Sequence, residues 1–330
     1  MPVKIVTDSS SDIPGDIARE LDITVVPLYI SFGTETLRDG VDIQPDEFYR
    51  RLVNDPVHPT TAAASPGDFA EIYEKLSHNA DGIISIHLSR KVSATFDAAL
   101  KGRELVSGKN CPVEVVDSRL VTIALGLVAI AAAKAARAGK TMQNTLDHIN
   151  EVIPCIRVYG FLDSLKYIAK GGRLGRAGPF LSSVLPVKPV LTMKDGSLAP
   201  TGVVRTRSKG IERLQELVRS TLHVKEIGIA HSADDQEIKS FVERLNSFLP
   251  HVKPTVTQLG PALGVHGGPG AILMAIERES PAAGAGLEAG ERKPAVSLPS
   301  LQSIRDSFAQ RKSRDSGHTS QCSLMPLNAV

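Results

Sequence analysis

Four residues of this sequence carry side chains that could bind a small anion, and each stands at a turn or a helix start. Thr61 precedes an expected helix, Ser93 stands at the start of another, Arg173 follows two glycines, and His266 lies in a glycine-rich run. Hydroxyl groups, free amides at a helix start, a guanidinium and an imidazole all bind carboxylates or phosphates. These residue types therefore indicate an anion site.

Each of the four residues also has a purely structural interpretation. Ser93 is suited to cap a helix, Thr61 to an ordinary loop in which Ser65 is the cap, and Arg173 to a solvated position after a helix end. A lone histidine such as His266 more often has a structural role. The residue pattern alone leaves both interpretations open at every position.

The signatures of common nucleotide-binding and hydrolytic enzymes are absent from the sequence. It contains no GxxxxGK[ST], no GxGxxG that opens a helix after a strand, no GxSxG and no HExxH. The cysteines Cys111, Cys155 and Cys322 have no CxxC spacing, and no histidine cluster accompanies them. We therefore expect no metal, no cofactor and no catalytic residue, and a reducing cytoplasm suits the free thiols.

The composition indicates a soluble globular protein rather than a nucleic-acid-binding or membrane-spanning one. Hydrophobic residues make up 42% of the 330 residues and charged residues 22%, whereas aromatics are only 4% and Trp is absent. The net charge is +2 and the Lys and Arg residues are scattered, which argues against a nucleic-acid partner. The most apolar stretch, 121–133, is too short to span a bilayer and is expected to be a buried helix, although transient contact with a membrane surface stays compatible.

The first half of the chain alternates short apolar strands with helices. Strands are expected at 3–7, 23–30, 82–87 and 113–116, and helices at 69–76, 93–106 and 121–138. This alternation predicts a doubly wound α/β domain with a parallel sheet. Hydroxyl-rich turns at 7–11, 60–65, 89–95 and 117–118 would meet at the carboxyl edge of that sheet, where such folds bind ligands.

The second half mixes helices with hairpins and predicts a smaller α+β domain. Helices are expected at 162–169, 208–221 and 233–248, and strands at 187–193, 198–205, 226–231, 255–259 and 270–277. Residues 170–176 are expected to form a flexible basic turn, and Asp195-Gly196 a hairpin turn. The predicted organisation is an α/β domain at 1–155, an α+β domain at 156–280 and a disordered tail at 281–330 that holds a short helix at 299–309.

Eight of these segments, in chain order, resemble motifs of the DegV family of bacterial fatty-acid-binding proteins. They are TDSSSD at 7–12, PTTAAAS at 59–65, SRKVSATF at 89–96, VDS at 116–118, LKYIAKGGRL at 165–174, VKPVL at 187–191, GVVRT at 202–206 and HGGPG at 266–270.

The resemblance implies a lipid-binding carrier and not an enzyme. A long-chain fatty acid would lie in a tunnel between the two domains, and a separate fatty acid kinase would convert its carboxylate to an acyl phosphate. Thr61 and Ser93 would contact the carboxylate, while Arg173 and His266 would flank it and stabilise the phosphorylated form. Further candidate ligand-binding residues are Ser9, Ser10, Ser89, Thr95, Gly172, Arg205, Gly267 and Gly268.

Three departures from the family motifs lie near the expected site, and those at 62–64 and at Gly267 remove hydrogen-bonding side chains. Ala62-Ala63-Ala64 replaces Ser-Gln-Pro, Ala94 replaces a glycine, and Gly267 replaces a threonine. Each lost neutral hydrogen bond is worth about 1 kcal/mol, so the site is expected to be poorer in donors than is usual in the family.

Two other functions remain open from the sequence. An acyl ester or acyl phosphate hydrolase would use Ser93 as nucleophile and His266 as base. A regulatory module would bind another small anion and use the tail for protein contacts.

Overall fold

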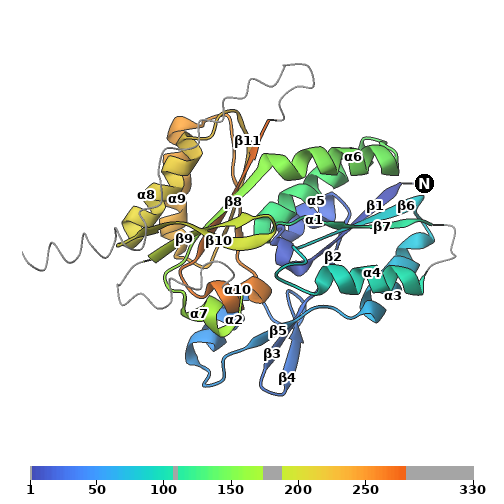
Figure 1. Ribbon diagram of the computed structural model, residues 1–330, viewed down its shortest axis with the longest axis horizontal. Coiled ribbons are helices and arrows are strands. Elements are labelled where there is room, and N and C mark those ends of the chain that lie inside the picture. The colour runs from blue at the N-terminus through green and yellow to red at the C-terminus, as the bar shows by residue number, and fades with distance from the viewer. Residues whose placement is uncertain (1, 107–110, 174–187, 280–330) are drawn as a thin grey trace, which may run out of the picture. The chain divides into compact units, whose positions relative to one another are not determined.

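A computed structural model describes residues 2–106, 111–173 and 188–279 (Figure 1). These residues form three sheets, of which the first along the chain is parallel. Its strands are β1 (Val3–Asp8), β2 (Ile23–Val26), β6 (Gly82–His87) and β7 (Val113–Asp117). They lie in the order β2-β1-β6-β7 with every neighbouring pair parallel. The predicted mixed α/β fold with an N-terminal parallel sheet is confirmed.

Helices cover both faces of this sheet. The helices α3 (Pro66–Ser77) and α4 (Thr95–Leu105) lie on one side, while α1 (Gly15–Glu20), α5 (Thr122–Arg137) and α6 (Met142–Val152) lie on the other (Figure 1). Alternate residues of one strand serve the two sides, because Ile83 packs with the first group and Ile84 with α5. This explains why the strands are apolar at nearly every position.

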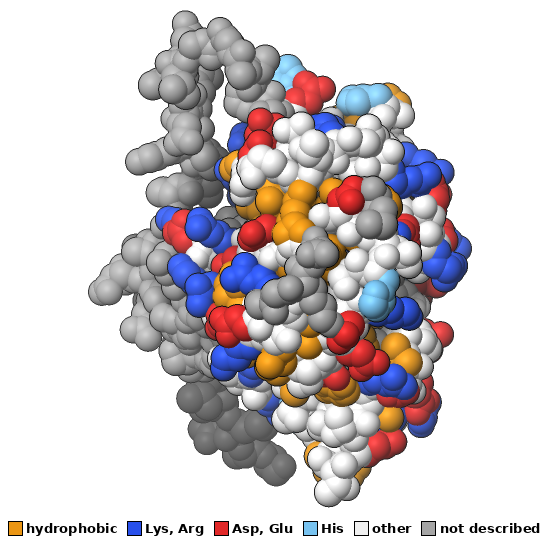
Figure 2. Space-filling model, turned by 90° about the vertical axis from the view of Figure 1, so that its right-hand side faces the viewer, with side chains coloured by type: hydrophobic (Ala, Val, Ile, Leu, Met, Phe, Trp, Pro, Cys, Tyr) orange, Lys and Arg blue, Asp and Glu red, His pale blue; other side chains and the backbone are white. Residues whose placement is uncertain are grey.

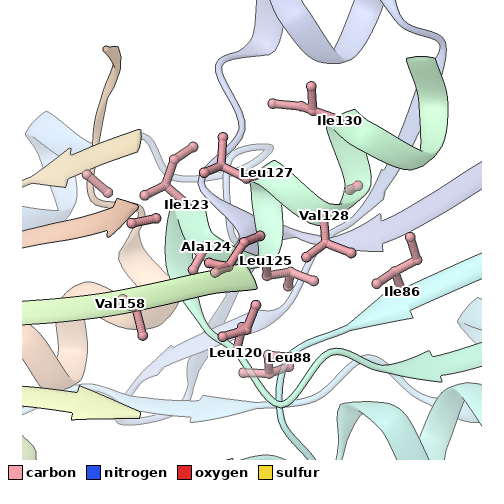
Figure 3. Close-up of a cluster of buried hydrophobic side chains, with 14 of the residues drawn as sticks. Ile86, Leu88, Leu120, Ile123, Ala124, Leu125, Leu127, Val128, Ile130 and Val158 are labelled. Carbon is pink, nitrogen blue, oxygen red and sulfur yellow. The ribbon is translucent and has the colours of Figure 1, made fainter. Parts of the chain in front are cut away.

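Helix α5 is buried along almost its whole length, as the run 121–133 predicts. Its residues Ile123, Leu125 and Val128 pack against Ile86 of the first sheet and share one core cluster with Val158 of another sheet (Figure 3). A helix that is apolar on all sides needs cover on all sides, and two sheets supply it. Within the described ranges, no helix is long and apolar enough to cross a membrane.

The expected strand at 23–30 is wrong, because the chain changes sheets at Pro27. Strand β2 ends at Val26, and β3 (Tyr29–Phe32) joins a small antiparallel sheet with β4 (Glu35–Arg38) and β5 (Thr60–Ala62). Proline has no amide for the ladder, and the amide of Leu28 donates to Ser9 Oγ instead. Because β5 belongs to this small sheet, Thr61 lies in a strand rather than in the predicted loop. The helix α2 (Pro45–Asn54) beside this sheet was not predicted.

The second half forms a six-stranded sheet in the order β10-β9-β8-β13-β11-β12. Its strands are β8 (Ile156–Phe161), β9 (Lys188–Lys194), β10 (Ser197–Val204), β11 (Val224–His231), β12 (Thr255–Gln258) and β13 (Ile272–Arg278). Only the β11–β12 pair is parallel within this sheet. Helices α8 (Arg207–Arg219) and α9 (Asp235–Phe248) pack on one face, and the predicted Asp-Gly turn joins β9 to β10 with both residues at positive φ.

Other element boundaries differ from the prediction. Helix α7 (Lys166–Lys170) starts later than the expected 162, and α4 starts at Thr95 rather than at Ser93. The glycine-rich run around His266 is not a loop, since the short helix α10 (Pro261–Gly267) includes this histidine. The strand β8 was not predicted.

The change of sheet at Ile156 coincides with the expected domain boundary, but α5 contacts both sheets, so the division at 155 stays a prediction. Residues 174–176 of the basic turn, Val187 of the expected strand, Cys322, the 281–330 tail and its expected helix lie outside the described residues.

Charged side chains of both signs are mixed on the surface drawn in Figure 2. On this face, Lys and Arg lie among Asp and Glu and form no extended patch of one sign. Such a mixed face does not provide the continuous basic stripe that nucleic-acid binding requires.

Candidate functional site

A mostly apolar cavity of about 340 Å³ lies between the parallel sheet's carboxyl edge, one face of the second sheet and α10. Its volume falls in the range of about 300–1,000 Å³ that is usual for small-molecule sites. Among the described residues, the polar side chains on its wall are Ser10, Thr61, Ser93, Thr122, Arg173, Thr192 and His266. The larger apolar side chains are Leu28, Leu88, Val92, Val121, Val158, Leu162, Ile168, Leu191, Met193, Leu198, Leu263 and Leu273.

The cavity adjoins the point where the order of the parallel strands reverses. Strands β1 and β6 are neighbours in the sheet although a long stretch of chain separates them. The turns that follow them bring Ser10 and Ser93 to the cavity wall. Open α/β sheets bind ligands at this position because loops from adjacent strands diverge there.

All four principal residues predicted from the sequence line this cavity. Thr61 Oγ1 and His266 Nε2 are 3.2 Å apart, so a hydrogen bond joins the small antiparallel sheet to α10. Ser93 Oγ lies 2.8 Å from Thr95 Oγ1 and accepts from the Thr95 amide at 3.3 Å. Ser93 thus supports the helix start locally and still faces the cavity.

Arg173 is placed by the end of helix α7. The amide of Gly172 donates to Ala169 O and that of Arg173 to Ile168 O, which is the Schellman pattern of helix termination. Gly172 has φ +70°, a conformation that favours glycine. Arg173 is exposed to solvent although it borders the cavity, and its Nη1 donates to Gly171 O at 2.6 Å.

The glycine before Gly172 makes room for the histidine. A Cβ atom on Gly171 would lie only 2.0 Å from His266 Nδ1. The two consecutive glycines therefore have separate purposes: Gly172 ends the helix, and Gly171 lets α10 approach α7.

Burial, together with the positive charge of Arg173 and the nearby His58, lowers the pKa of His266 to about 4. The ring is therefore neutral near pH 7. Its Nδ1 is buried and has no hydrogen-bond partner among the described residues. A proton on Nε2 would be donated to Thr61 Oγ1, whereas a proton on Nδ1 would be a buried N–H without an acceptor, which is rare.

Of the further candidates, Ser10 and Gly267 line the cavity, while Ser9, Ser89, Thr95, Gly172, Arg205 and Gly268 do not. Ser9 Oγ donates to Asp39 at 2.7 Å and accepts from the amide of Leu28. Ser89 is buried, and its Oγ donates to Gly196 O in the β9–β10 turn at 2.7 Å. Ser9 and Ser89 therefore do not contact a ligand in the cavity but hold the neighbouring backbone at Leu28 and at the β9–β10 turn.

The hydroxyl of Ser10 is held by a buried polar chain. Asp8 accepts hydrogen bonds from the amide and the hydroxyl of Ser10, and its other oxygen lies 2.9 Å from His87 Nδ1. His87 Nε2 lies 2.7 Å from Ser85 Oγ, to which Tyr73 donates at 2.8 Å. The order Ser85–His87–Asp8 matches that of a hydrolase triad, but all three are fully buried and Ser85 does not reach the cavity. We interpret this chain as structural.

Two buried carboxyl groups hold the start of α10. Asp12 accepts from the amide of Gly260 at 2.8 Å and from Thr122 Oγ1 at 2.7 Å, and Asp39 accepts from the amide of Ala262 at 3.3 Å. Burial raises the pKa of Asp12 to about 8 and that of Asp39 to about 6, although these hydrogen bonds oppose the rise. The first half of the chain therefore anchors the helix that carries His266.

Sequence analysis missed Thr122 and Thr192 and the apolar floor of the cavity. Thr122 has φ +55° at the start of α5, and Thr192 Oγ1 donates to Val158 O at 2.7 Å. Val158 and Gly160 of β8 line the floor, and Leu162 follows at the same spacing of two. That alternation was the available signal, but the strand itself was not recognised.

The departures from the family motifs lie at the cavity. Ala62, Ala63, Ala94 and Gly267 all line its wall, at positions where the motifs have larger or polar groups or a glycine. The wall therefore has fewer hydrogen-bonding groups than the resemblance alone would suggest.

The contacts expected of a nucleophile and its base are not formed in this structure. Ser93 Oγ pairs with Thr95 and His266 Nε2 with Thr61, and no carboxylate orients His266 Nδ1 among the described residues. In the same part of the chain, no group of three His, Cys, Asp or Glu could hold a metal ion.

Comparison with known proteins identifies the family. The family model described as "Uncharacterised protein, DegV family" matches residues 2–279. This chain belongs to the DegV family. A DegV domain-containing protein of Caldanaerobacter subterraneus is 36% identical over 280 residues, which cover 84% of this chain and 99% of that protein. The resemblance drawn from the eight motifs is confirmed.

Solved structures of DegV proteins have the same fold. DegV of Bacillus subtilis, described as a fatty acid binding protein, has a TM-score of 0.78 and 30% identity and covers 84% of this chain and 100% of its own. A stearic-acid-binding protein of Eubacterium ventriosum has a TM-score of 0.77 and 26% identity, with 84% and 98% covered.

Proposed function

We propose that this DegV protein binds a long-chain fatty acid in the cavity, with the carboxylate at Thr61, Ser93, Arg173 and His266. The observation that carries the proposal is the composition of the wall, where apolar side chains surround a few groups that can bind a carboxylate. Solved DegV proteins that are described as fatty-acid-binding support this choice of ligand.

The energetics of an acyl chain suit this cavity. Each methylene group removed from water contributes about 0.8 kcal/mol, so a long chain supplies most of the binding free energy. The carboxylate must keep its hydrogen bonds, because an unpaired charge is costly to bury. The hydroxyls of Thr61 and Ser93 supply donors for this purpose, while the guanidinium of Arg173 flanks the carboxylate at the solvent-exposed side.

The neutral His266 assigns a direction to the hydrogen bonds. With its proton on Nε2, the imidazole donates to Thr61 Oγ1, and the Thr61 hydroxyl is then free to donate to the carboxylate. A neutral ring also avoids placing a second full positive charge next to Arg173.

We further propose that the bound carboxylate is presented to a separate fatty acid kinase in the cytoplasm. Arg173 supports this step, because it borders the cavity and is exposed to solvent, so a head group beside it is within reach of a partner protein. The free thiols of Cys111 and Cys155 suit a reducing compartment.

Titration of lipid-free protein with oleate tests the binding proposal. We expect saturable binding, which Ser93→Ala weakens by about tenfold because a carboxylate contact is lost. Arg173→Ala is expected to retain most of the oleate affinity and mainly to impair phosphoryl transfer by a partner kinase. Absence of oleate binding by the unaltered protein would reject the proposal.

A further inference from the structure

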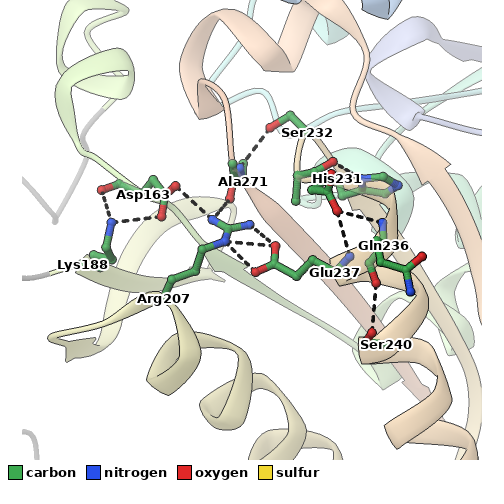
Figure 4. A network of polar contacts seen from close by, with 12 residues as sticks. Asp163, Lys188, Arg207, His231, Ser232, Gln236, Glu237, Ser240 and Ala271 are labelled. Carbon is green, nitrogen blue, oxygen red and sulfur yellow. Dashed lines mark hydrogen bonds and ion pairs between the residues drawn. The ribbon is translucent and has the colours of Figure 1, made fainter.

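Arg207, at the first position of α8, joins three separate parts of the second half through one guanidinium (Figure 4). Its Nε donates to both carboxylate oxygens of Glu237 at 2.8 and 3.0 Å. Its Nη1 donates to Gly270 O at 2.7 Å and lies 3.0 Å from Asp163 Oδ2. The Nε edge of the guanidinium thus binds α9, and its Nη1 atom binds the loop at Asp163 and the loop at Gly270.

These two loops lead to the two head-group residues of the second half. Asp163 lies between β8 and α7, and the chain then continues through α7 to Arg173. Gly270 follows α10, which carries His266. A single nitrogen atom of Arg207 therefore contacts both segments on which the proposed site depends.

Helices α7 and α10 also pack directly against each other, so neither can shift far relative to the other without a steric clash. The His266 ring packs on Gly171, as described above. One turn away, a Cβ on Gly268 would lie 2.2 Å from the ring of Tyr167 in α7. A shift of either loop would disturb the place of the imidazole beside Arg173.

Gly270 allows the approach that the Nη1 contacts require. It has φ +80°, and a Cβ at this position would lie 2.4 Å from Asp163 Oδ2 and 3.0 Å from Arg207 Nη1. Ser232 holds the same loop as well, since its Oγ accepts from the Ala271 amide at 3.0 Å (Figure 4). The same Oγ donates to Gly268 O at 2.7 Å. The loop is fixed between Ser232 and Arg207.

We propose that Arg207 is a positioning residue for the head-group site: its Nη1 ties the Asp163 loop to Gly270 O and so fixes Arg173 and His266 relative to each other. The proposal rests on the proposed function for the meaning of the site, but its geometry is independent of any ligand. Lysine could not reproduce it, because an ammonium lacks the planar set of donors that reaches three partners in different directions.

Four single variants of the full chain test this role. Arg207→Gln removes both sets of contacts, and Glu237→Gln alters only the tie to α9. Asp163→Asn weakens the tie to the α7 loop and also the ion pair between Asp163 and Lys188. Arg213→Gln is the matched control, since Arg213 lies on the same helix and pairs with Glu216. The readouts are the pKa of His266 by NMR in ligand-free protein, the Kd for oleate and the thermal unfolding midpoint.

We expect Arg207→Gln to raise the pKa of His266 from about 4 toward its ordinary value, because the ring moves away from Arg173 and becomes hydrated. Oleate binding should weaken by about tenfold, because the displaced ring no longer orients the Thr61 hydroxyl. Asp163→Asn should change both quantities in the same direction by a smaller amount. Glu237→Gln and Arg213→Gln should leave the His266 pKa unchanged.

An unchanged His266 pKa in Arg207→Gln, or equal changes in Arg207→Gln and Glu237→Gln, would overturn the proposal, because Arg207 would then act only by joining α8 to α9. If Arg207→Gln does not fold, Asp163→Asn decides by the same two readouts when it is compared with Lys188→Met, which removes only the contacts between Lys188 and Asp163. Failure of the unaltered protein to bind oleate would reject the proposed function alone, since the His266 pKa is measured without ligand.

Discussion

At the scale of single residues, Thr61 and His266 define the polar part of the site through one hydrogen bond of 3.2 Å. The sequence placed both in the site by their motifs, but the link between them depends on β5 and α10, two elements that the sequence did not predict. Their side-chain chemistry could be recognised from residue type, whereas their distance could not.

Substitution of Thr61 by valine tests this hydrogen bond. Valine keeps the shape of the side chain and removes the hydroxyl, so oleate affinity should fall by about tenfold or more, the equivalent of one hydrogen bond to a charged group. Thr60→Val is the matched control, since Thr60 lies on the same strand but does not line the cavity. Equal affinities of the two variants in calorimetric titration would contradict the assigned role.

The neighbouring glycines Gly171 and Gly172 should respond differently to alanine. Gly171→Ala places a methyl group against the His266 ring and should displace it, so oleate binding weakens and the His266 NMR signals shift. Gly172→Ala meets no neighbouring atom and should only lower the free energy of unfolding by about 1 kcal/mol, because its φ is positive. Denaturant unfolding and oleate titration of both variants would separate the two effects, and a reversed pattern would refute them.

At the scale of elements, the apolar strands of the parallel sheet were predictable because burial on both faces makes each strand a short continuous apolar run. Strand β6 was predicted with its observed bounds for this reason. The break between β2 and β3 at Pro27 was not predictable, because the sequence does not show that Ser9 Oγ accepts a hydrogen bond from the amide of Leu28. Strand β8, which forms the floor of the cavity, was missed because Arg157 and Tyr159 interrupt its apolar pattern.

Burial of the Asp12 carboxyl group beside the start of α10 makes the stability of the protein depend on pH. The folded protein keeps a proton on Asp12 up to about pH 8, its pKa in the fold, whereas the unfolded chain loses it near the ordinary pKa of 3.8. The folded state therefore binds more protons between these values, and this contribution to stability is present at low pH and lost as the pH rises.

The substitution Asp12→Asn should remove the decrease in stability that the ionisation of Asp12 causes as the pH rises. Asparagine can accept from the Gly260 amide and donate to Thr122 Oγ1 without ionising. Relative to the unaltered protein, the variant should become more stable as the pH rises from 5 to 8, by up to about 1.4 kcal/mol per pH unit. A stability difference that stays constant over this range, measured by urea unfolding, would show that Asp12 is ionised in the folded state.

At the scale of the whole molecule, the cavity exists because two sheets share α5 and leave space beside it. The motifs predicted that residues from both halves meet at one site, and the cavity wall has contributions from both. Which face of each strand in the second sheet borders the cavity depends on the packing of the sheets, so the apolar floor could not be read from single segments.

Among the residues that the structure describes, those on the cavity wall all lie between Ser10 and Leu273. A protein that ends at residue 280 should therefore bind oleate with the Kd of the full chain, within about twofold. Parallel titrations of the two proteins check this. A much larger Kd for the shortened protein would assign the 281–330 tail a part in ligand binding.

The most direct test of the central claim is mass spectrometry of the ligand that purifies with the protein, recorded first under native conditions and again after organic extraction. The account predicts one long-chain fatty acid per chain, and its loss from a Thr61→Val, Ser93→Ala double variant that still folds. A chain that carries no lipid and also fails to take up added fatty acid, or that carries a different small anion in this cavity, would contradict it.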